Sequence, residues 1–389
     1  MLSSSQNRRV QTQKMHTRAR DLWQRISDGI AVQELWSQFS SEARASYRLY
    51  SREVDWTRSP TEKGHKRLQR VASGLFWAMV MKLSPARRVL FIAALVLLFF
   101  PGFDVKFQGG EFQMPNVSFF GALAFLVLLA LELADRVTMK RDLEIAKEIQ
   151  TWLMPAAPPR VPGVDMAFAT RPANTVAGDY YDAFLLDTPT GSARPCPALL
   201  LIVADVAGKS VPAALLMATL QASLRTLARL CTSQVELIER LNRYCCEQNV
   251  GGQRFTTAFL AEFDPASRQF SYVNAGHNWP VLRRASGQIE RLQTGGVPLG
   301  LLSQARYECS MATLEAGDQL VVFTDGLVEA EDIKEEQYGE IRMLATMSGR
   351  SDLTAAQMLQ LLMTSVDRFV GSAPQHDDIT CLVMRLVPS

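Results

Sequence analysis

The stretch TRPANTVAGDYYDAFLLD, from Thr170 to Asp187, places a Gly-Asp pair, two tyrosines and another aspartate around an apolar segment. A second stretch, LLIVADVAGKSVPAALLMA, carries Asp205 to the end of a run of Leu, Ile and Val. The same arrangement recurs with Asp325 in FTDGL and with Asp377 and Asp378 in HDDIT. One aspartate at a strand end is usually structural, because turns favour this residue. Four such places in one domain indicate a shared site.

Strand and helix patterns alternate from Val164 to the C-terminus. The run ALLLIVADV is typical of a buried strand, and PAALLMATLQASLRTLARL predicts a long helix with Pro212 in its first turn. The runs FTTAFLAEFD and QFSYVNAGH lie on either side of the turn PASR, as in a hairpin. The mixture predicts an α+β domain over 155–389, with long antiparallel strands and a few helices.

Carboxylates that converge in a partly dry site repel one another, and a divalent cation removes that penalty. The six cysteines show neither zinc spacing nor a disulfide framework, and we expect them to be reduced thiols. Hard, oxygen-ligated Mg²⁺ or Mn²⁺ is therefore favoured over zinc. Two such ions would lower the pKa of a shared water, and the resulting hydroxide could attack phosphorus.

The N-terminal region 1–83 is basic. Met1 to Arg88 carries a net charge of +10, which leaves −8 on the rest because the whole chain is +2. Apolar residues at helical spacing predict a mostly helical cytoplasmic region. Helices lying on a membrane surface and a small helical domain explain this spacing equally well.

Two apolar runs follow within 84–134. Val89 to Phe103 has no charged residue across 15 positions, and Phe112 to Leu131 has none across 20. A membrane-spanning helix needs roughly 20 residues, so two transmembrane helices are predicted, at about 86–103 and 113–133. The first run is short, and a buried helical hairpin is the alternative.

Basic residues set the expected orientation of these helices. Several flank the two runs, whereas the loop between them holds one: Arg87, Arg88, Arg136, Lys140 and Arg141 against Lys106. The positive-inside rule therefore places both termini in the cytoplasm, in a multi-pass protein of the inner membrane. An anionic inner leaflet also accounts for the basic region. No nucleic-acid motif is present, so no nucleic-acid partner is expected.

A helical connector is predicted over 135–154. Ile145, Ile149, Trp152 and Leu153 recur at helical spacing, and Pro155 ends the run. This apolar face could pair with a second copy of the chain to form a homodimer. Packing against its own domain is the alternative.

Seven motifs together carry a resemblance to a known family: EIQTWLMP, AGDYYD, VADVAGKSVPAALLMA, NAGHNWP, GGVPLG, FTDGLVEA and DDIT. In this order they resemble motifs of PPM-type (type 2C) metal-dependent protein serine/threonine phosphatases, of the bacterial RsbU/SpoIIE-like branch. The resemblance covers roughly 143–387. It departs at Ala177, where the family often has Gly, and at Ala207 and Ser210, which are small enough to preserve the turn.

The resemblance implies a β-sandwich flanked by helices, with a two-metal site for Mn²⁺ or Mg²⁺ at one edge. Asp205 would bridge both metals and Val206 would lend its backbone carbonyl. Asp325 and Asp377 would hold one metal, and Asp179 would serve the other. Asp378 is a second choice beside Asp377. Asp205 and Asp325 would then act in catalysis through the metal-activated water.

His277 in NAGHNWP could contact substrate phosphate or act in acid catalysis, and the alternative is that it fixes a turn. Lys209 could likewise meet substrate phosphate or be a solvated residue at a helix start.

These expectations combine into a membrane-anchored phosphatase acting on phosphoserine or phosphothreonine of a bacterial regulatory protein, such as an anti-sigma-factor antagonist. The alternative is a non-catalytic membrane scaffold that binds a phosphorylated partner. A metal-dependent nuclease or nucleotide phosphohydrolase uses similar chemistry, but the acidic balance of the C-terminal region disfavours it.

Overall fold

The computed structural model of the chain describes residues 73–74, 76–77, 80–99, 103–107, 110–114, 117–186, 197–208, 210–249, 254–350 and 352–388. Residues 103–107 and 110–114 are described as backbone only. Most of the basic region 1–83 and Lys209 lie outside these residues. The chain divides into two compact units, Met1–Asp135 and Arg136–Ser389.

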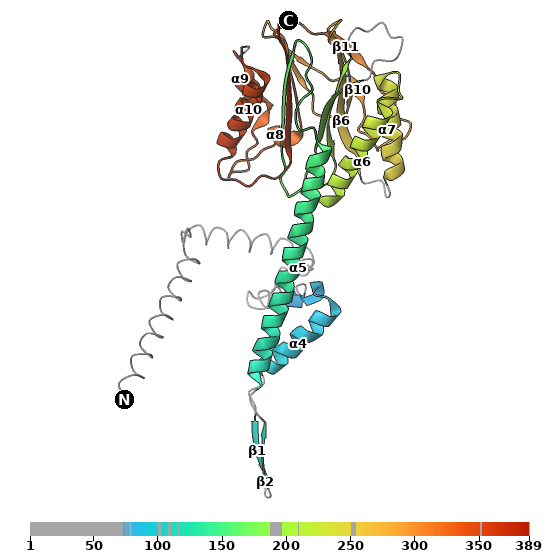
Figure 1. The fold of residues 1–389 in the computed structure, drawn as a ribbon. Helices are drawn as coiled ribbons and strands as arrows, with labels where there is room; N and C mark the ends of the chain where they lie inside the picture. The colour runs from blue at the N-terminus through green and yellow to red at the C-terminus, as the bar shows by residue number, and fades with distance from the viewer. Residues whose placement is uncertain are drawn as a thin grey trace, which may run out of the picture. The chain divides into compact units, whose positions relative to one another are not determined.

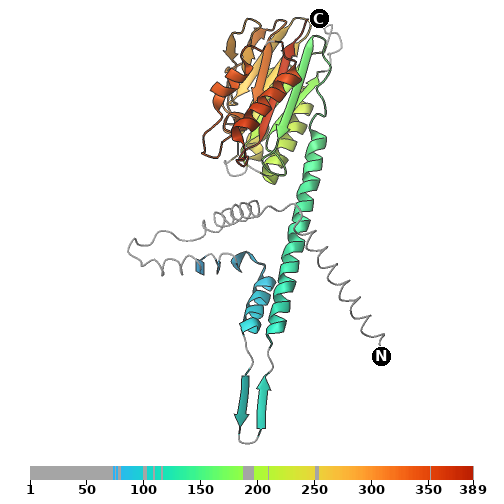
Figure 2. The same cartoon turned by 90° about the vertical axis from the view of Figure 1, so that its left-hand side faces the viewer.

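In its described part, the first unit contains helix α4, a β-hairpin and the first part of helix α5 (Figure 2). Helix α4 spans Pro85–Phe99, strands β1 and β2 span Phe103–Phe107 and Gly110–Met114, and helix α5 begins at Ser118 and ends at Leu153. The hairpin pairs from Phe103 opposite Met114 to Phe107 opposite Gly110. The expected helices at about 86–103 and 113–133 are therefore too long where they approach the connecting loop. Phe103, Gln113 and Met114, which were expected to be helical, belong to the paired strands β1 and β2.

Helices α4 and α5 approach each other closely at a glycine. A Cβ atom at Gly121 would lie 2.5 Å from the backbone nitrogen of Leu98, and Ala94 on α4 is fully buried. At the other end of this pair, the Nη1 atom of Arg87 lies 3.3 Å from Glu132 and 2.7 Å from Asp135. A small residue and an ion pair thus hold the two helices together.

Within the described residues, α5 is the one helix long and apolar enough to cross a membrane. Only a small part of its most apolar stretch is buried. Helix α4, with 15 residues, is shorter than a span requires. This observation gives weak support to one membrane-associated helix, and the pair of transmembrane helices stays a prediction.

Helix α5 also contains the expected connector as one continuous helix of 36 residues. The segment has no proline and a single glycine, so nothing in it interrupts the backbone hydrogen bonds. Pro155 follows its end by two residues.

The second unit contains two β-sheets. In the first, the strand order is β10-β7-β6-β5-β4, with β11 paired to β7, and in the second it is β3-β13-β12-β8-β9. All neighbours are antiparallel except β10 and β7. The strands are β3 Val164–Arg171, β4 Tyr180–Leu185, β5 Leu199–Val206, β6 Thr256–Asp264, β7 Gln269–Ala275, β8 Val281–Arg283, β9 Ile289–Arg291, β10 Gly295–Gly296, β11 Ser310–Thr313, β12 Gln319–Phe323 and β13 Ile379–Leu386.

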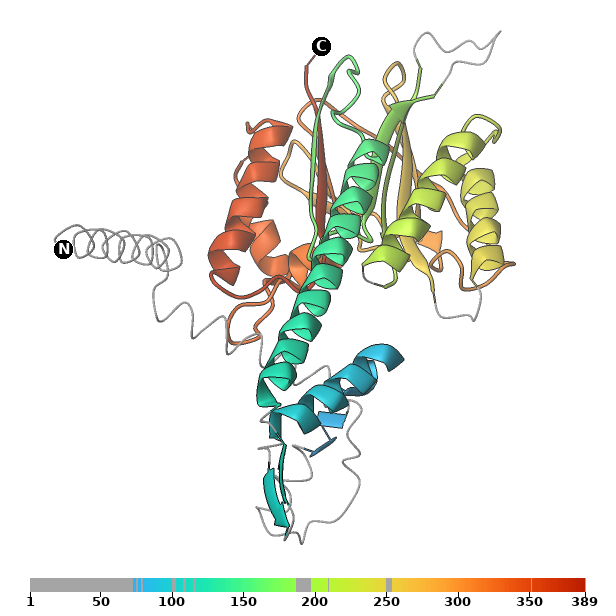
Figure 3. The same ribbon diagram turned by 60° about the horizontal axis from the view of Figure 1, so that its bottom comes forward.

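Helices cover the outer faces of both sheets (Figures 1 and 3). Helices α6 (Val211–Leu227) and α7 (Gln234–Gln248) pack on the first sheet, whereas α9 (Gly339–Met347) and α10 (Ala355–Val370) pack on the second. The short helix α8 spans Asp325–Val328. The predicted α+β architecture of sheets flanked by helices is confirmed.

Strand β5 shows why the sequence adopts this layered fold. Its side chains alternate between two hydrophobic clusters: Leu199, Leu201 and Val203 face the other sheet, and Leu200, Ile202 and Ala204 face α6 and α7. A strand covered on both faces is continuously apolar, as this sequence is. Helix α6 packs against this face of β5 with buried residues at helical spacing: Ala213, Met217, Leu220 and Leu224.

Candidate functional site

The strand registers bring the aspartate-bearing ends of both sheets to one edge of the sandwich. In the first sheet, Tyr180 at the start of β4 pairs with Ala204 near the end of β5. In the second, Phe323 at the end of β12 pairs with Cys381 near the start of β13. Asp179 and Asp205 therefore lie at one end of the first sheet, and Asp325 and Asp377 lie at one end of the second.

Thr324 connects the two sheets at this edge. Its hydroxyl donates a hydrogen bond of 2.8 Å to the carboxylate of Asp179, although 145 residues separate them in the sequence. Asp179 is only 2% exposed. Its pKa is raised well above the usual range, first by burial and then by the negative charge of Asp205, with Asp378 adding to the effect. The register thus brings acidic side chains from both sheets together.

Asp377 and Asp378 are adjacent but occupy different environments. The Asp378 carboxylate accepts hydrogen bonds from the backbone N–H groups of Ala173 (2.7 Å) and Gly178 (2.6 Å), one on each oxygen. It therefore holds the loop that precedes β4. Asp377 is exposed and lines a cavity of about 360 Å³ together with Gly326 and Glu329. This contrast favours Asp377 over Asp378 as a ligand.

Glycines allow the backbone segments to approach closely at this edge. A Cβ at Gly326 would lie 2.0 Å from the carbonyl oxygen of Asp378, so any other side chain would displace the start of β13. A Cβ at Gly178 would lie 3.1 Å from the carbonyl oxygen of Val206. Gly208 has a φ of +122°, a conformation that L side chains rarely adopt.

The donor set fits hard divalent cations. It consists of carboxylate oxygens and one backbone carbonyl, which Mg²⁺ and Mn²⁺ prefer. The pKa of Glu329 is raised by burial and then by Asp325 and Asp377, so this part of the edge also concentrates negative charge. Across the described part of the chain, however, no three His, Cys, Asp or Glu side chains converge closely enough to hold an ion as they stand. Suitable ligand groups therefore lie at this edge, but their positions in this structure do not form a metal coordination shell.

His277 lies in the interior, 3% exposed. Its Nδ1 atom is 2.9 Å from the Thr257 hydroxyl, and its backbone N–H donates to the Asn274 side chain over 2.7 Å. Burial lowers the pKa of its imidazole to about 4, so the ring is neutral at pH 7. This environment favours the role of fixing the turn over contact with substrate.

Sequence reasoning missed Gln150, on α5. Its side-chain amide donates to the carbonyl of Ala177 (2.7 Å) and accepts from the N–H of the same residue (3.0 Å). Gln150 is 8% exposed, whereas Ile145 and Ile149, which define the expected apolar face, are 46% and 49% exposed. A polar glutamine beside Ile149 in an amphipathic helix is expected to be exposed. The sequence does not indicate its contact with Ala177, because that contact depends on tertiary packing.

A family model described as Stage II sporulation protein E (SpoIIE) matches residues 197–387. The matched segment contains Asp205, Asp325 and Asp377, and begins after Asp179. Together with the helix-flanked sandwich, this match identifies the domain as a phosphatase of the PPM class.

Known proteins similar to the chain point to the same family. Phosphoserine phosphatase RsbU of Bacillus subtilis is 28% identical over 64% of this chain and 70% of its own length. Protein IcfG of Synechocystis sp. is 24% identical over 66% of this chain, which spans only 43% of that protein. A crystal structure of the RsbU and RsbW domains of a Mycobacterium tuberculosis protein has a TM-score of 0.50 and 28% identity, covering 60% of this chain and 64% of that one. The domain belongs to the RsbU/SpoIIE-like branch of the PPM-type serine/threonine phosphatases.

Proposed function

We propose that the chain is a metal-dependent phosphatase that hydrolyses phosphoserine or phosphothreonine on a bacterial regulatory protein, such as an anti-sigma-factor antagonist. One observation carries the proposal: Asp179 and Asp205 lie at strand ends of the first sheet, Asp325 and Asp377 lie at strand ends of the second, and the Thr324–Asp179 hydrogen bond joins these two ends. The similarity to phosphoserine phosphatase RsbU supports the choice of phosphoserine. The RsbW domain that accompanies an RsbU domain in the M. tuberculosis protein supports a regulatory protein as partner.

The residues of this edge would have two roles, holding the metal ions and positioning the ligands. Asp205, with the carbonyl of Val206, would hold ions on the side of Asp179, whereas Asp325 and Asp377 would do so from the second sheet. Thr324 fixes the orientation of the Asp179 carboxylate, as a residue behind a ligand commonly does. Two Mn²⁺ or Mg²⁺ ions, when bound, would supply an activated water and neutralise the phosphoryl oxygens.

Membrane anchoring is part of the proposal. Many large apolar side chains of α4 and α5 are exposed, among them Val89 (69%), Phe99 (74%) and Leu129 (63%), and a bilayer would cover them. With the distribution of basic residues, this supports a multi-pass inner-membrane protein whose termini and phosphatase domain lie in the cytoplasm.

A homodimer through the connector is also proposed. Ile145, Ile149 and Trp152 form an exposed apolar stripe on α5, with Trp152 79% exposed. Their spacing of four and three residues matches a coiled-coil seam, which a second copy of the helix would cover.

A non-catalytic scaffold that binds a phosphorylated partner is the alternative, and the acidic edge distinguishes the two. Negatively charged carboxylates repel a phosphate unless cations neutralise them, so they suit metal-dependent hydrolysis better than plain phosphate binding.

The test is phosphate release from an aryl phosphate and a phosphoserine protein by the full chain in detergent, with and without Mn²⁺. We expect turnover only with metal, and a loss of at least about 100-fold in Asp205→Asn and Asp325→Asn, because each removes a charged ligand. Asp352→Asn is the matched control and should retain activity, because Asp352 is exposed and its carbonyl accepts from Arg385, near the end of β13 opposite Asp377. Tight phosphopeptide binding without turnover would favour the scaffold.

A further inference from the structure

Three exposed apolar side chains border the aspartate-bearing edge. Trp279 is 53% exposed in the turn between β7 and β8, Phe255 is 40% exposed directly before β6, and Val297 is 39% exposed after β10. Single exposed apolar residues are common on protein surfaces. These three are distinguished by their position, which the strand pairing specifies. We refer to Trp279, Phe255 and Val297 as the apolar rim.

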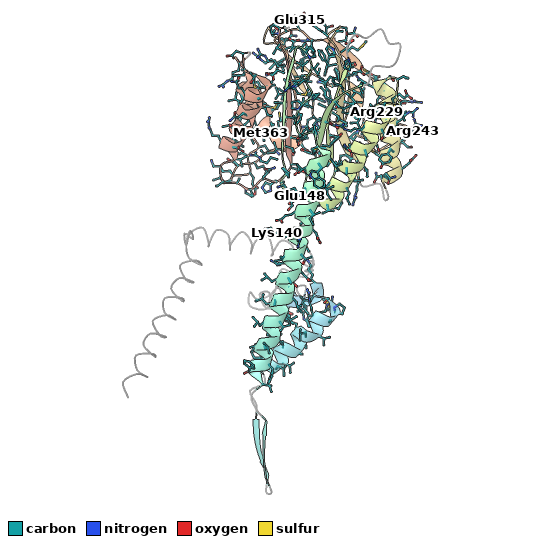
Figure 4. The ribbon with its side chains drawn as sticks, viewed as in Figure 1. Lys140, Glu148, Arg229, Arg243, Glu315 and Met363 are labelled. Atoms are coloured by element: carbon teal, nitrogen blue, oxygen red, sulfur yellow. The ribbon has the colours of Figure 1, made fainter. Side chains whose placement is uncertain are left out.

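Trp279 and Phe255 flank the loops that carry aspartates. Val281, the second residue after Trp279, pairs with Val321, two residues before the end of β12 at Phe323, so the turn that carries Trp279 lies at the same end of the second sheet as Asp325. The carbonyl of Phe255 accepts a 2.9 Å hydrogen bond from the N–H of Ala207, the second residue after Asp205. The rim therefore lies beside both halves of the proposed site. Figure 4 labels Glu315, which precedes β12, at the opposite end of the domain.

The turn that presents Trp279 is braced from several sides. The hydrogen bond between Thr257 and His277 ties it to the start of β6, next to Phe255. Asn274 accepts from the backbone N–H of His277 and donates to the carbonyl of Leu292 over 3.1 Å. A Cβ at Gly276 would lie 2.5 Å from the ring of Pro298, which fixes the neighbouring Val297 segment against the same turn. The buried His277 thus serves to hold an exposed indole in place.

A tryptophan held on a braced turn is suited to binding. It presents a large apolar area, and little conformational entropy remains to be lost when a partner covers it. Tryptophan is also enriched among the residues that dominate the energy of protein interfaces. A small phosphate ester does not reach beyond the aspartates and would gain nothing from such a residue, whereas a polypeptide extends past them.

We propose that the apolar rim binds an apolar side chain of the phosphorylated polypeptide, so that the site selects peptide and protein substrates over small phosphate esters. The inference rests on the proposed phosphatase function and names the chemistry of its substrate. Adjacent strands lie about 4.8 Å apart and an extended peptide advances about 3.3 Å per residue, so a few residues of bound peptide span the separation between neighbouring loops at the edge. An apolar residue two to four positions from the phosphoserine reaches the rim.

The experiment uses the full chain in detergent with Mn²⁺ and a set of glycine-rich phosphoserine nonapeptides. Leucine is placed singly at each position from four before to four after the phosphoserine. For wild type, we expect kcat/KM to rise about tenfold when leucine stands two to four positions away on one side. Trp279→Ala should abolish this preference, and Trp279→Phe should keep most of it.

Ile341→Ala is the control, because Ile341 is 85% exposed on α9, on the outer face of the second sheet, and this variant should retain the preference. Affinity for a fluorescein-labelled leucine peptide, measured by anisotropy, should fall about tenfold in Trp279→Ala, and this readout needs no turnover.

An identical preference and affinity in wild type and Trp279→Ala would overturn the inference. So would a changed oligomeric state of Trp279→Ala with the preference intact, which would assign the rim to a second copy. Absence of phosphate release by wild type from every substrate contradicts the phosphatase function instead, and anisotropy still decides the docking.

Discussion

Neighbouring residues of the same type serve different purposes at the aspartate-bearing edge. Asp378 uses both carboxylate oxygens to hold the backbone of the loop before β4, and Asp377 next to it faces a cavity. The backbone N–H of His277 donates to Asn274, and one of its ring nitrogens forms a hydrogen bond with Thr257, which together hold the turn that carries Trp279. Chemistry-bearing residue types thus supply structural support as well as candidate ligands, and burial separates the two groups.

His277 leads to a prediction about pH. Burial lowers the pKa of its imidazole from 6.5 to about 4, so between these values the unfolded chain binds a proton that the folded chain does not. The free energy of unfolding should therefore decrease as the pH falls from about 6.5 towards 4, by up to about 3 kcal/mol. Calorimetric melting of wild type and His277→Gln between pH 7 and 4.5 measures this.

The His277→Gln variant should show a shallower decrease of melting temperature with pH than wild type. His376→Gln, which changes an exposed histidine, should leave the slope as it is. Equal slopes in wild type and His277→Gln would contradict the assignment of a buried, neutral imidazole.

At the scale of elements, α5 connects to the site through an amide. The two hydrogen bonds between Gln150 and Ala177 fix the backbone two residues before Asp179. A third, longer hydrogen bond of 3.4 Å joins Gln221 on α6 to the carbonyl of Leu153 at the end of α5. The end of α5 therefore contacts both the loop before β4 and the helix after the Asp205 loop.

Gln150→Leu should lower kcat about tenfold or more while KM changes little. The substitution keeps the side-chain volume but leaves a buried N–H and a buried carbonyl of Ala177 without partners, which costs about 1–3 kcal/mol and releases the loop. Steady-state kinetics on an aryl phosphate measure the effect. Glu148→Gln on the same helix, labelled in Figure 4 and exposed, is the control. Unchanged kcat in Gln150→Leu would show that this contact does not position Asp179.

Local patterns predict an α+β domain with aspartates at its strand ends, and the resemblance to the phosphatase family adds the sandwich and its metal edge. Continuous apolar runs such as β5 predict buried strands, and aspartates at their ends mark the edge where antiparallel strands begin and finish. Other features depend on which distant segments meet. The Thr324–Asp179 bond spans 145 residues, and the β1–β2 hairpin replaces part of an apolar run that had been expected to be helical. Neither has a local signature.

At the scale of the whole molecule, a basic and apolar N-terminal third precedes an acidic domain. The proposed topology places the β1–β2 hairpin outside the membrane and the phosphatase domain inside. Lys106→Cys should then be labelled by a membrane-impermeant maleimide in intact cells, whereas the native, exposed Cys309 should react only after lysis. Labelling of Lys106→Cys only after lysis would contradict two membrane crossings.

The central claim is that aspartates from distant strands meet at one edge to hold divalent cations. Titration of the full chain with Mn²⁺, with free Mn²⁺ followed by electron paramagnetic resonance, tests it most directly. The account predicts two bound ions per chain in wild type, at most one in Asp205→Asn, and two in the control Asp352→Asn. Equal binding by wild type and Asp205→Asn, or no binding at millimolar Mn²⁺, would contradict it.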